Sequence, residues 1–289
     1  MKSGIIANLH IETGGNPSGP AILLLHGVLR QIADLEPIID RLPKDLGWIA
    51  VDMVGHGKSA PASHPYKVRD YCGDVVRLLS AIPRRPLIAF GHSLGAMVAA
   101  FAASAAPENV IGAILEDPPF TTMGSRIKES SYYLQFQGLK DLVFWTSKNQ
   151  DFYGSLLTGL RDLPVIRASD GERVRMSDVR GDEAIQTYAR YLTQVDPRVL
   201  DPIVASQWLD GYDFEDIASK ITSPILLLQA DSKAGGMLTD DDATRFSKSA
   251  AHCRVTKIEG ASHLMHATHA DALAAEISTF IDSLRPQFA

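Results

Sequence analysis

The sequence predicts an α/β fold in which a parallel sheet is covered by helices on both faces. Short apolar runs recur along the chain, and such runs are typical of strands that are buried on both sides. Stretches with the spacing of amphipathic helices alternate with these runs. A chain of 289 residues, of which 45% are hydrophobic and 21% charged, is long enough to bury a core of this kind.

The predicted elements follow one another in a regular order. Apolar runs such as AILLL and ILLLQ predict strands over residues 5–12, 21–25, 48–52, 87–90, 113–116, 225–229 and 255–258. Helical spacing predicts helices over residues 32–41, 68–82, 94–106, 240–250 and 270–284. Because helices separate most of the strands, their connections are the crossovers that parallel strands require.

Residues 118–216 interrupt this alternation. They contain no strand-like run, and they hold 13 of the 21 aromatic residues of the chain. We expect a helical cap inserted between two strands, with an aromatic face over an apolar pocket. In the alternative interpretation, the rings only pack the insert onto the core. The predicted domains are a core of residues 1–117 and 217–289 and a cap of residues 118–216.

The segment GHSLG at 91–95 lies where a predicted strand meets a predicted helix. In this context G-x-S-x-G is typical of a nucleophile elbow, a turn so sharp that its serine adopts a positive φ. Side chains at Gly91 and Gly95 would collide as the helix folds back on the strand. The pattern predicts Ser93 as a nucleophile near the amino end of a helix.

A nucleophilic serine needs a base and usually a carboxylate that orients the base. His263 lies in the loop between the last predicted strand and the last helix, and it is the predicted base. Asp231 and Asp117 each end a strand that follows the nucleophile strand, so either could reach His263. Asp231 is preferred, because Asp117 could instead cap the entry to the insert. Glu116 is a weaker candidate, since strand alternation turns it the other way.

The oxyanion of acyl transfer needs two donors. The backbone N–H of Leu94, directly after the nucleophile, is one predicted donor. The second is expected from Val28 or Leu29, in the loop after AILLLHG. His26 in that loop is expected to be a buried structural residue.

Two other motifs are weaker. His266 and His269 follow His263 at three-residue steps, but no matching carboxylate or cysteine pattern accompanies them, so we expect no metal site. The segment GKS at 57–59 resembles the end of a P-loop, yet Asp52 stands where the first glycine of that motif belongs. We therefore expect no nucleotide cofactor.

The net charge of −6 argues against nucleic-acid partners and anionic membranes. The amino-terminal residues lack the pattern of a signal peptide, and the apolar runs are too short to span a membrane. Cys72 and Cys253 share no motif and are expected to be free thiols, which favours the cytoplasm. The oligomeric state, monomer or homodimer, is left open.

Together these segments resemble the α/β-hydrolase superfamily. The motifs LLLHG, DMVGHGKS, GHSLG, QAD and GASH occur in the order of that family, over essentially the whole chain. The resemblance implies a mostly parallel eight-stranded sheet, a cap after the sixth strand and no cofactor. Many members place the acid further into the loop after the penultimate strand, where this chain has Ser232 and Lys233. Haloalkane dehalogenases and fungal zearalenone lactonases place it after the sixth strand, where Asp117 lies.

The expected function is a serine hydrolase that cleaves an ester or lactone of a moderately large apolar small molecule. Ser93 would attack the carbonyl, His263 would take its proton, and Val28 and Leu94 would bind the oxyanion. A second hypothesis keeps the same residues but cleaves a C–C or amide bond, or carries out cofactor-free perhydrolysis. A third is a ligand receptor of the same fold with slow or absent turnover.

Overall fold

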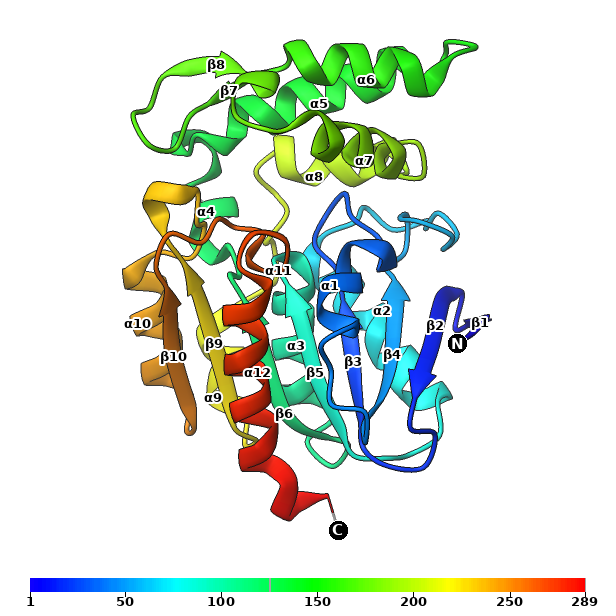
Figure 1. Ribbon diagram of the computed structural model, residues 1–289, viewed down its shortest axis with the longest axis vertical. Coiled ribbons are helices and arrows are strands. Elements are labelled where there is room, and N and C mark those ends of the chain that lie inside the picture. The colour runs from blue at the N-terminus through cyan, green and yellow to red at the C-terminus, as the bar shows by residue number, and fades with distance from the viewer. Residues whose placement is uncertain (125, 289) are drawn as a thin grey trace.

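The computed structural model describes residues 1–124 and 126–288, and its centre is an eight-stranded sheet (Figure 1). The strand order is β1-β2-β4-β3-β5-β6-β9-β10. All neighbours pair in parallel except β1 with β2 and β2 with β4. The predicted parallel α/β fold is therefore confirmed. The strands are β1 (Lys2–Ile6), β2 (Leu9–Gly15), β3 (Ala21–Leu25), β4 (Gly47–Asp52), β5 (Leu87–His92), β6 (Val110–Glu116), β9 (Ile225–Ala230) and β10 (Cys253–Ile258).

The single strand predicted over residues 5–12 is wrong, because the chain reverses within it. Ala7 and Asn8 have φ of 51° and 66°, and they form the turn of the β1–β2 hairpin. Two consecutive residues at positive φ are typical of the tight hairpin turns whose twist matches the strands. Asn tolerates this conformation better than most residues.

Helices cover both faces of the sheet, and the strands bury side chains on each side. In β3, Leu23 and Leu25 join the hydrophobic cluster beneath α2 and α3, whereas Ile22 and Leu24 join the cluster beneath α12. The first face carries α2 (Val68–Ala81), α3 (Leu94–Ala105), α9 (Phe214–Lys220) and α10 (Asp240–Ser249), and the second carries α1 (Glu36–Ile39), α11 (Met265–Thr268) and α12 (Ala270–Leu284).

The helix predicted over residues 32–41 is shorter than expected. A 3₁₀ turn over Ile32–Leu35 leads into the four-residue α1, which has Pro37 in its first turn. Proline lacks the N–H that a continuous helix through this position would use, so a new helix starts there.

Residues 118–216, here called the insert, lie above the carboxyl ends of the strands (Figure 1). The prediction that they contain no strand is wrong, since β7 and β8 form a small antiparallel hairpin. At three residues each, these strands are too short to give a periodic signal. Helix α9 begins within the insert but packs against α3 and α10. The other elements of the insert are α4 (Phe120–Met123), α5 (Tyr132–Thr146), α6 (Phe152–Asp162), β7 (Pro164–Ile166), β8 (Arg173–Arg175), α7 (Asp182–Leu192) and α8 (Asp201–Val204).

Both cysteines, Cys72 in α2 and Cys253 at the start of β10, are free, as predicted. Within the described ranges, every helix is too short or too polar to cross a membrane.

Candidate active site

Ser93 occupies a strained corner between β5 and α3. Its φ and ψ are 55° and −115°, a conformation that costs a residue with a Cβ about 1–3 kcal/mol. A Cβ added to Gly91 would overlap the carbonyl of Gly95, and one added to Gly95 would overlap the carbonyl of Leu25. The two glycines therefore let the helix return against the strands, and the predicted elbow geometry is present.

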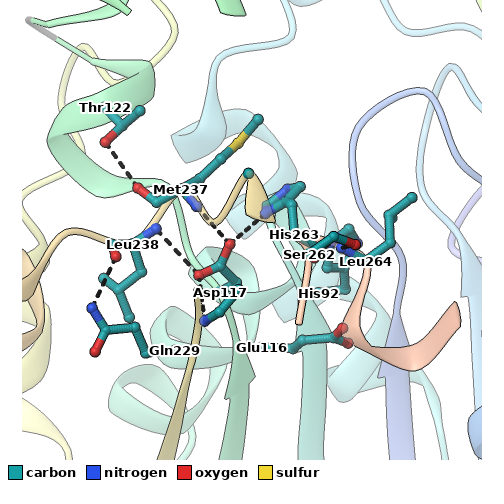
Figure 2. Close-up of polar contacts among 12 residues, drawn as sticks. His92, Glu116, Asp117, Thr122, Gln229, Met237, Leu238, Ser262, His263 and Leu264 are labelled. Carbon is teal, nitrogen blue, oxygen red and sulfur yellow. Dashed lines mark hydrogen bonds and ion pairs between the residues drawn. The ribbon is translucent and has the colours of Figure 1, made fainter. Parts of the chain in front are cut away.

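His263 lies in the loop after β10, and its ring contacts a buried carboxylate. Nδ1 of His263 lies 2.6 Å from Oδ2 of Asp117, which directly follows β6 (Figure 2). The Asp117 carboxylate also accepts backbone N–H bonds from Ala230 at 3.1 Å, Met237 at 2.8 Å and Leu238 at 3.2 Å. These donors satisfy the ionised carboxylate and fix its position beneath the histidine.

The preference for Asp231 as the partner of His263 is wrong. Asp231 caps the short turn after β9: it accepts the N–H of Lys233 at 2.9 Å and the N–H of Gly260 at 3.1 Å. These two backbone bonds lower the pKa of Asp231. β6 and β9 are neighbours whose carboxyl ends lie at the same edge of the sheet, so the sequence pattern could not separate the two aspartates.

Glu116 faces the opposite side of the sheet from Asp117, as strand alternation predicted (Figure 2). It accepts the backbone N–H of His266 and contacts Nδ1 of the same residue, both at 2.9 Å. Nε2 of His266 lies 3.1 Å from Asp34. Burial opposes protonation of His266, but the two carboxylates outweigh it and raise the pKa of His266 to about 10. His266 is therefore a buried cation between two anions.

A metal site at the C-terminal histidines does not follow from this geometry. Asp34, His92 and His266 can bring one ligand atom each within 4.8 Å of one another. A metal needs an unprotonated imidazole nitrogen, whereas both ring nitrogens of His266 donate to carboxylates. His269 contacts the hydroxyl of Thr268 instead.

No pattern in the sequence predicted a role for His92. Its Nε2 donates to the main-chain carbonyl of His263 at 2.9 Å, and the two rings pack with their centroids 4.6 Å apart. Burial, with His263 and His266 nearby, holds the pKa of His92 well below its ordinary value. The neutral ring therefore holds the loop that carries His263. Its place directly before Ser93 in GHSLG was the available signal.

The loop after β3 supplies the candidate oxyanion donors. The N–H of Leu29 donates to Nε2 of His56 at 3.1 Å, so it is already used. Among the described residues, the N–H groups of Val28 and Leu94 have no acceptor. Of the two alternatives predicted for the second donor, this geometry favours Val28.

His26 is a structural residue, as expected. Its Nδ1 donates to the carbonyl of Gly27 at 2.7 Å, and its Nε2 accepts the N–H of Met53 at 2.9 Å.

In the P-loop-like stretch, Asp52 accepts hydrogen bonds from the N–H groups of Ile32 at 2.8 Å and Lys58 at 3.0 Å. The P-loop-like stretch thus holds the loops together beneath the site.

A cavity of about 660 Å³ joins these groups to the insert. Ser93 and His263 both line it, although the described residues show no hydrogen bond between their side chains. Such bonds are often long in unliganded enzymes. Of the 13 aromatic residues in the insert, four line the cavity: Tyr132, Phe136, Tyr188 and Trp208. Others pack the insert onto the core, as Phe120 does by stacking on Phe246 of α10.

A model of the alpha/beta hydrolase family matches residues 22–276 of this sequence. The chain belongs to the alpha/beta hydrolase family. The matched region begins in β3 and ends in α12, so it includes Ser93, Asp117 and His263.

Curated relatives of this alpha/beta hydrolase align over parts of their length. Lipase LipV from Mycobacterium tuberculosis is 34% identical over 126 residues, which are 43% of this chain and 47% of the lipase. The 2-(acetamidomethylene)succinate hydrolase from Mesorhizobium japonicum is 34% identical over 112 residues, 39% of this chain and 40% of that enzyme. The match thus spans less than half of the length of each of these two relatives.

Solved structures share the fold over almost the whole chain. The enol-lactonase from Burkholderia xenovorans LB400 superposes with a TM-score of 0.71 at 16% identity, covering 95% of this chain and 96% of that one. Naproxen esterase from Bacillus subtilis superposes with a TM-score of 0.71 at 19% identity, covering 97% and 91%. The eight-stranded sheet of this alpha/beta hydrolase is therefore the sheet of the family.

Proposed function

We propose that this alpha/beta hydrolase is a serine hydrolase that cleaves a carboxylic ester or a lactone through an acyl-enzyme. One observation carries the proposal: Ser93, on a strained corner, lines the same cavity as His263, whose ring is anchored by the buried Asp117. A nucleophile, a base and the group that orients the base are the three parts that such chemistry needs.

The hydrogen bond to Asp117 determines the tautomer of His263. An ionised carboxylate only accepts, so Nδ1 carries the proton and Nε2 keeps a lone pair. In the proposed mechanism Nε2 takes the proton of Ser93 as Oγ attacks the carbonyl carbon, and then gives it to the leaving alcohol oxygen. The N–H groups of Val28 and Leu94 bind the oxyanion. Water, deprotonated by His263, then releases the acid and restores Ser93.

The size and lining of the cavity support a moderately large substrate with an apolar body. A cavity of about 660 Å³ is in the range of sites for small organic molecules, and four aromatic side chains of the insert line it. We propose that the insert acts as the cap of this site. The partial likeness to a lipase supports an ester bond.

A second candidate is cleavage of another bond by the same residues. It draws support from the equally similar hydrolase that acts on 2-(acetamidomethylene)succinate. A panel of aryl esters, lactones, anilides and vinylogous diketones separates the two candidates by which members are turned over.

Active-site labelling tests the proposed nucleophile directly. A fluorophosphonate should add its phosphonyl mass to one site of the intact protein, and peptide mapping should find it on Ser93. The Ser93→Ala variant should gain no mass. An unlabelled wild-type protein, under conditions that label a control esterase, would contradict the proposal.

A further inference from the structure

The charges that line the cavity are all of one sign, although the chain as a whole is acidic. Its net charge is −6, yet among the described residues that line the cavity there is no carboxylate. The charged lining residues are Arg30, Arg167, Arg180 and Lys233. A one-signed cavity favours substrates of the opposite sign.

For three of these cations, a carboxylate or water already balances the charge. Arg167 pairs with Asp170 at 2.6 Å, and Arg30 pairs with Asp34 at 3.5 Å. Lys233 is exposed, so water solvates its ammonium group. None of the three needs a ligand to balance its charge.

Arg180 differs from them. It lies just before α7 and is partly buried, and its guanidinium forms no hydrogen bond or ion pair with any residue that the structure describes. The guanidinium lies 5.8 Å from the ring centre of Tyr188, and that of Arg30 lies 4.8 Å from the same ring. Two like charges thus share one aromatic side chain.

The nearby anions are already balanced. Asp34 faces Arg30 and His266, and Glu116 faces His266. These two carboxylates and two cations leave no negative charge for Arg180. Burial, with Arg30 close by, lowers the pKa of Arg180, as expected for a cation without an anionic partner.

We propose that Arg180 binds a carboxylate of the substrate, so that the ester or lactone has an apolar body and an anionic end. A planar guanidinium can bind a carboxylate through two parallel hydrogen bonds, and partial exclusion of water strengthens them. The nature of the cleaved bond rests on the proposed function, whereas the carboxylate site does not depend on turnover.

Matched substrates test the inference by kinetics. The mono-para-nitrophenyl esters of glutaric, adipic and suberic acid are compared with the para-nitrophenyl esters of pentanoic, hexanoic and octanoic acid, after subtraction of the enzyme-free rates. For the chain length that reaches Arg180, the wild type should prefer the anionic ester, and Arg180→Gln should reduce the ratio of the two kcat/KM values about 10- to 100-fold. Arg180→Lys should reduce this ratio less, because lysine keeps the positive charge but cannot donate two parallel hydrogen bonds to a carboxylate.

The matched control is Arg175→Gln. Arg175 lies in the same insert, and its substitution changes the net charge by the same amount. Unlike Arg180, it is exposed and paired with Asp178 at 3.1 Å. It should leave the ratio unchanged. A ratio that is the same in the wild type, Arg180→Gln and Arg175→Gln at every chain length would overturn the inference.

Binding without turnover separates this inference from the proposed function. Adipate and suberate are titrated by calorimetry into the Ser93→Ala protein with and without Arg180→Gln. Arg180→Gln should weaken binding about 10-fold or more even if no ester is ever hydrolysed. Equal affinity in the two proteins, each shown to be folded by its thermal transition, would reject the carboxylate site while leaving the hydrolase proposal untouched.

Discussion

The floor and the roof of the cavity differ in how their charged side chains are paired. At the floor, near the ends of the strands, Ser93 and His263 line the cavity. Behind them, Asp117 contacts His263 and three backbone N–H groups, and the buried His266 lies between two carboxylates. At the roof, formed by the insert, Arg180 has no anionic partner among the described residues. Because the charged groups near the floor all have partners, they are held in one geometry, as catalysis of bond cleavage requires. In our proposal, a carboxylate of the substrate supplies the partner that Arg180 lacks.

The largest effect on kcat should come from replacing Asp117 at the floor. Asp117→Asn removes the charge that orients His263 and stabilises its protonated form, so kcat for an ester should fall by about 10³- to 10⁴-fold. Asp231→Asn changes a carboxylate that contacts only backbone N–H groups, so kcat should stay within about 2-fold of the wild-type value. Steady-state kinetics of the two variants, with thermal melting to check folding, make the comparison.

Two results would contradict this assignment. One is a larger loss of kcat in Asp231→Asn than in Asp117→Asn. The other is an equally small effect of both, because then neither carboxylate would orient the histidine.

The next effect concerns stability and its pH dependence. The pKa of His266 is raised from 6.5 to about 10, so the folded state binds this proton more tightly than the unfolded chain does. The resulting contribution to the free energy of unfolding is complete below pH 6.5 and is lost as the pH rises through about 10. We expect a loss of roughly 2–5 kcal/mol across that window. Denaturant titrations at a series of pH values measure it.

The variant His266→Gln should remove this pH dependence. It should also lower the free energy of unfolding at neutral pH by roughly 3–5 kcal/mol, since Asp34 and Glu116 would lose their buried cation. His269→Gln is the matched control, because His269 lies outside this network and should keep the wild-type profile. Parallel profiles for the wild type and His266→Gln would show that another group causes the slope.

How much of this could be predicted from sequence differs between floor and roof. The strands at the floor are predictable because they are apolar runs such as AILLL. The sharp turn at GHSLG is predictable because side chains at Gly91 and Gly95 would collide with the backbone. The choice between Asp117 and Asp231 could not be made, because it depends on which of two neighbouring strand ends lies under the His263 loop. Local pattern does not contain that information.

The roof was less predictable still. Helical spacing reports that the insert is helical, but not which of its side chains reach the cavity. Arg180 looks like an ordinary surface arginine in the sequence. Its significance is that no described anionic side chain pairs with its guanidinium, which only the structure can show. The sequence therefore predicts an apolar substrate but not a carboxylate on it.

The smallest effect should come from His92, which acts on the floor through another residue. His92→Phe keeps an aromatic ring against His263 but removes the N–H that holds the His263 carbonyl. The loss of one partly buried hydrogen bond costs about 1 kcal/mol, so kcat should fall about 5- to 10-fold, with KM little changed. His92→Gln restores an N–H donor at a similar reach and should recover part of the loss. Since a merely structural role would lower stability without this rescue of kcat, a His92→Gln variant no more active than His92→Phe would mean that the ring alone, through packing, positions His263.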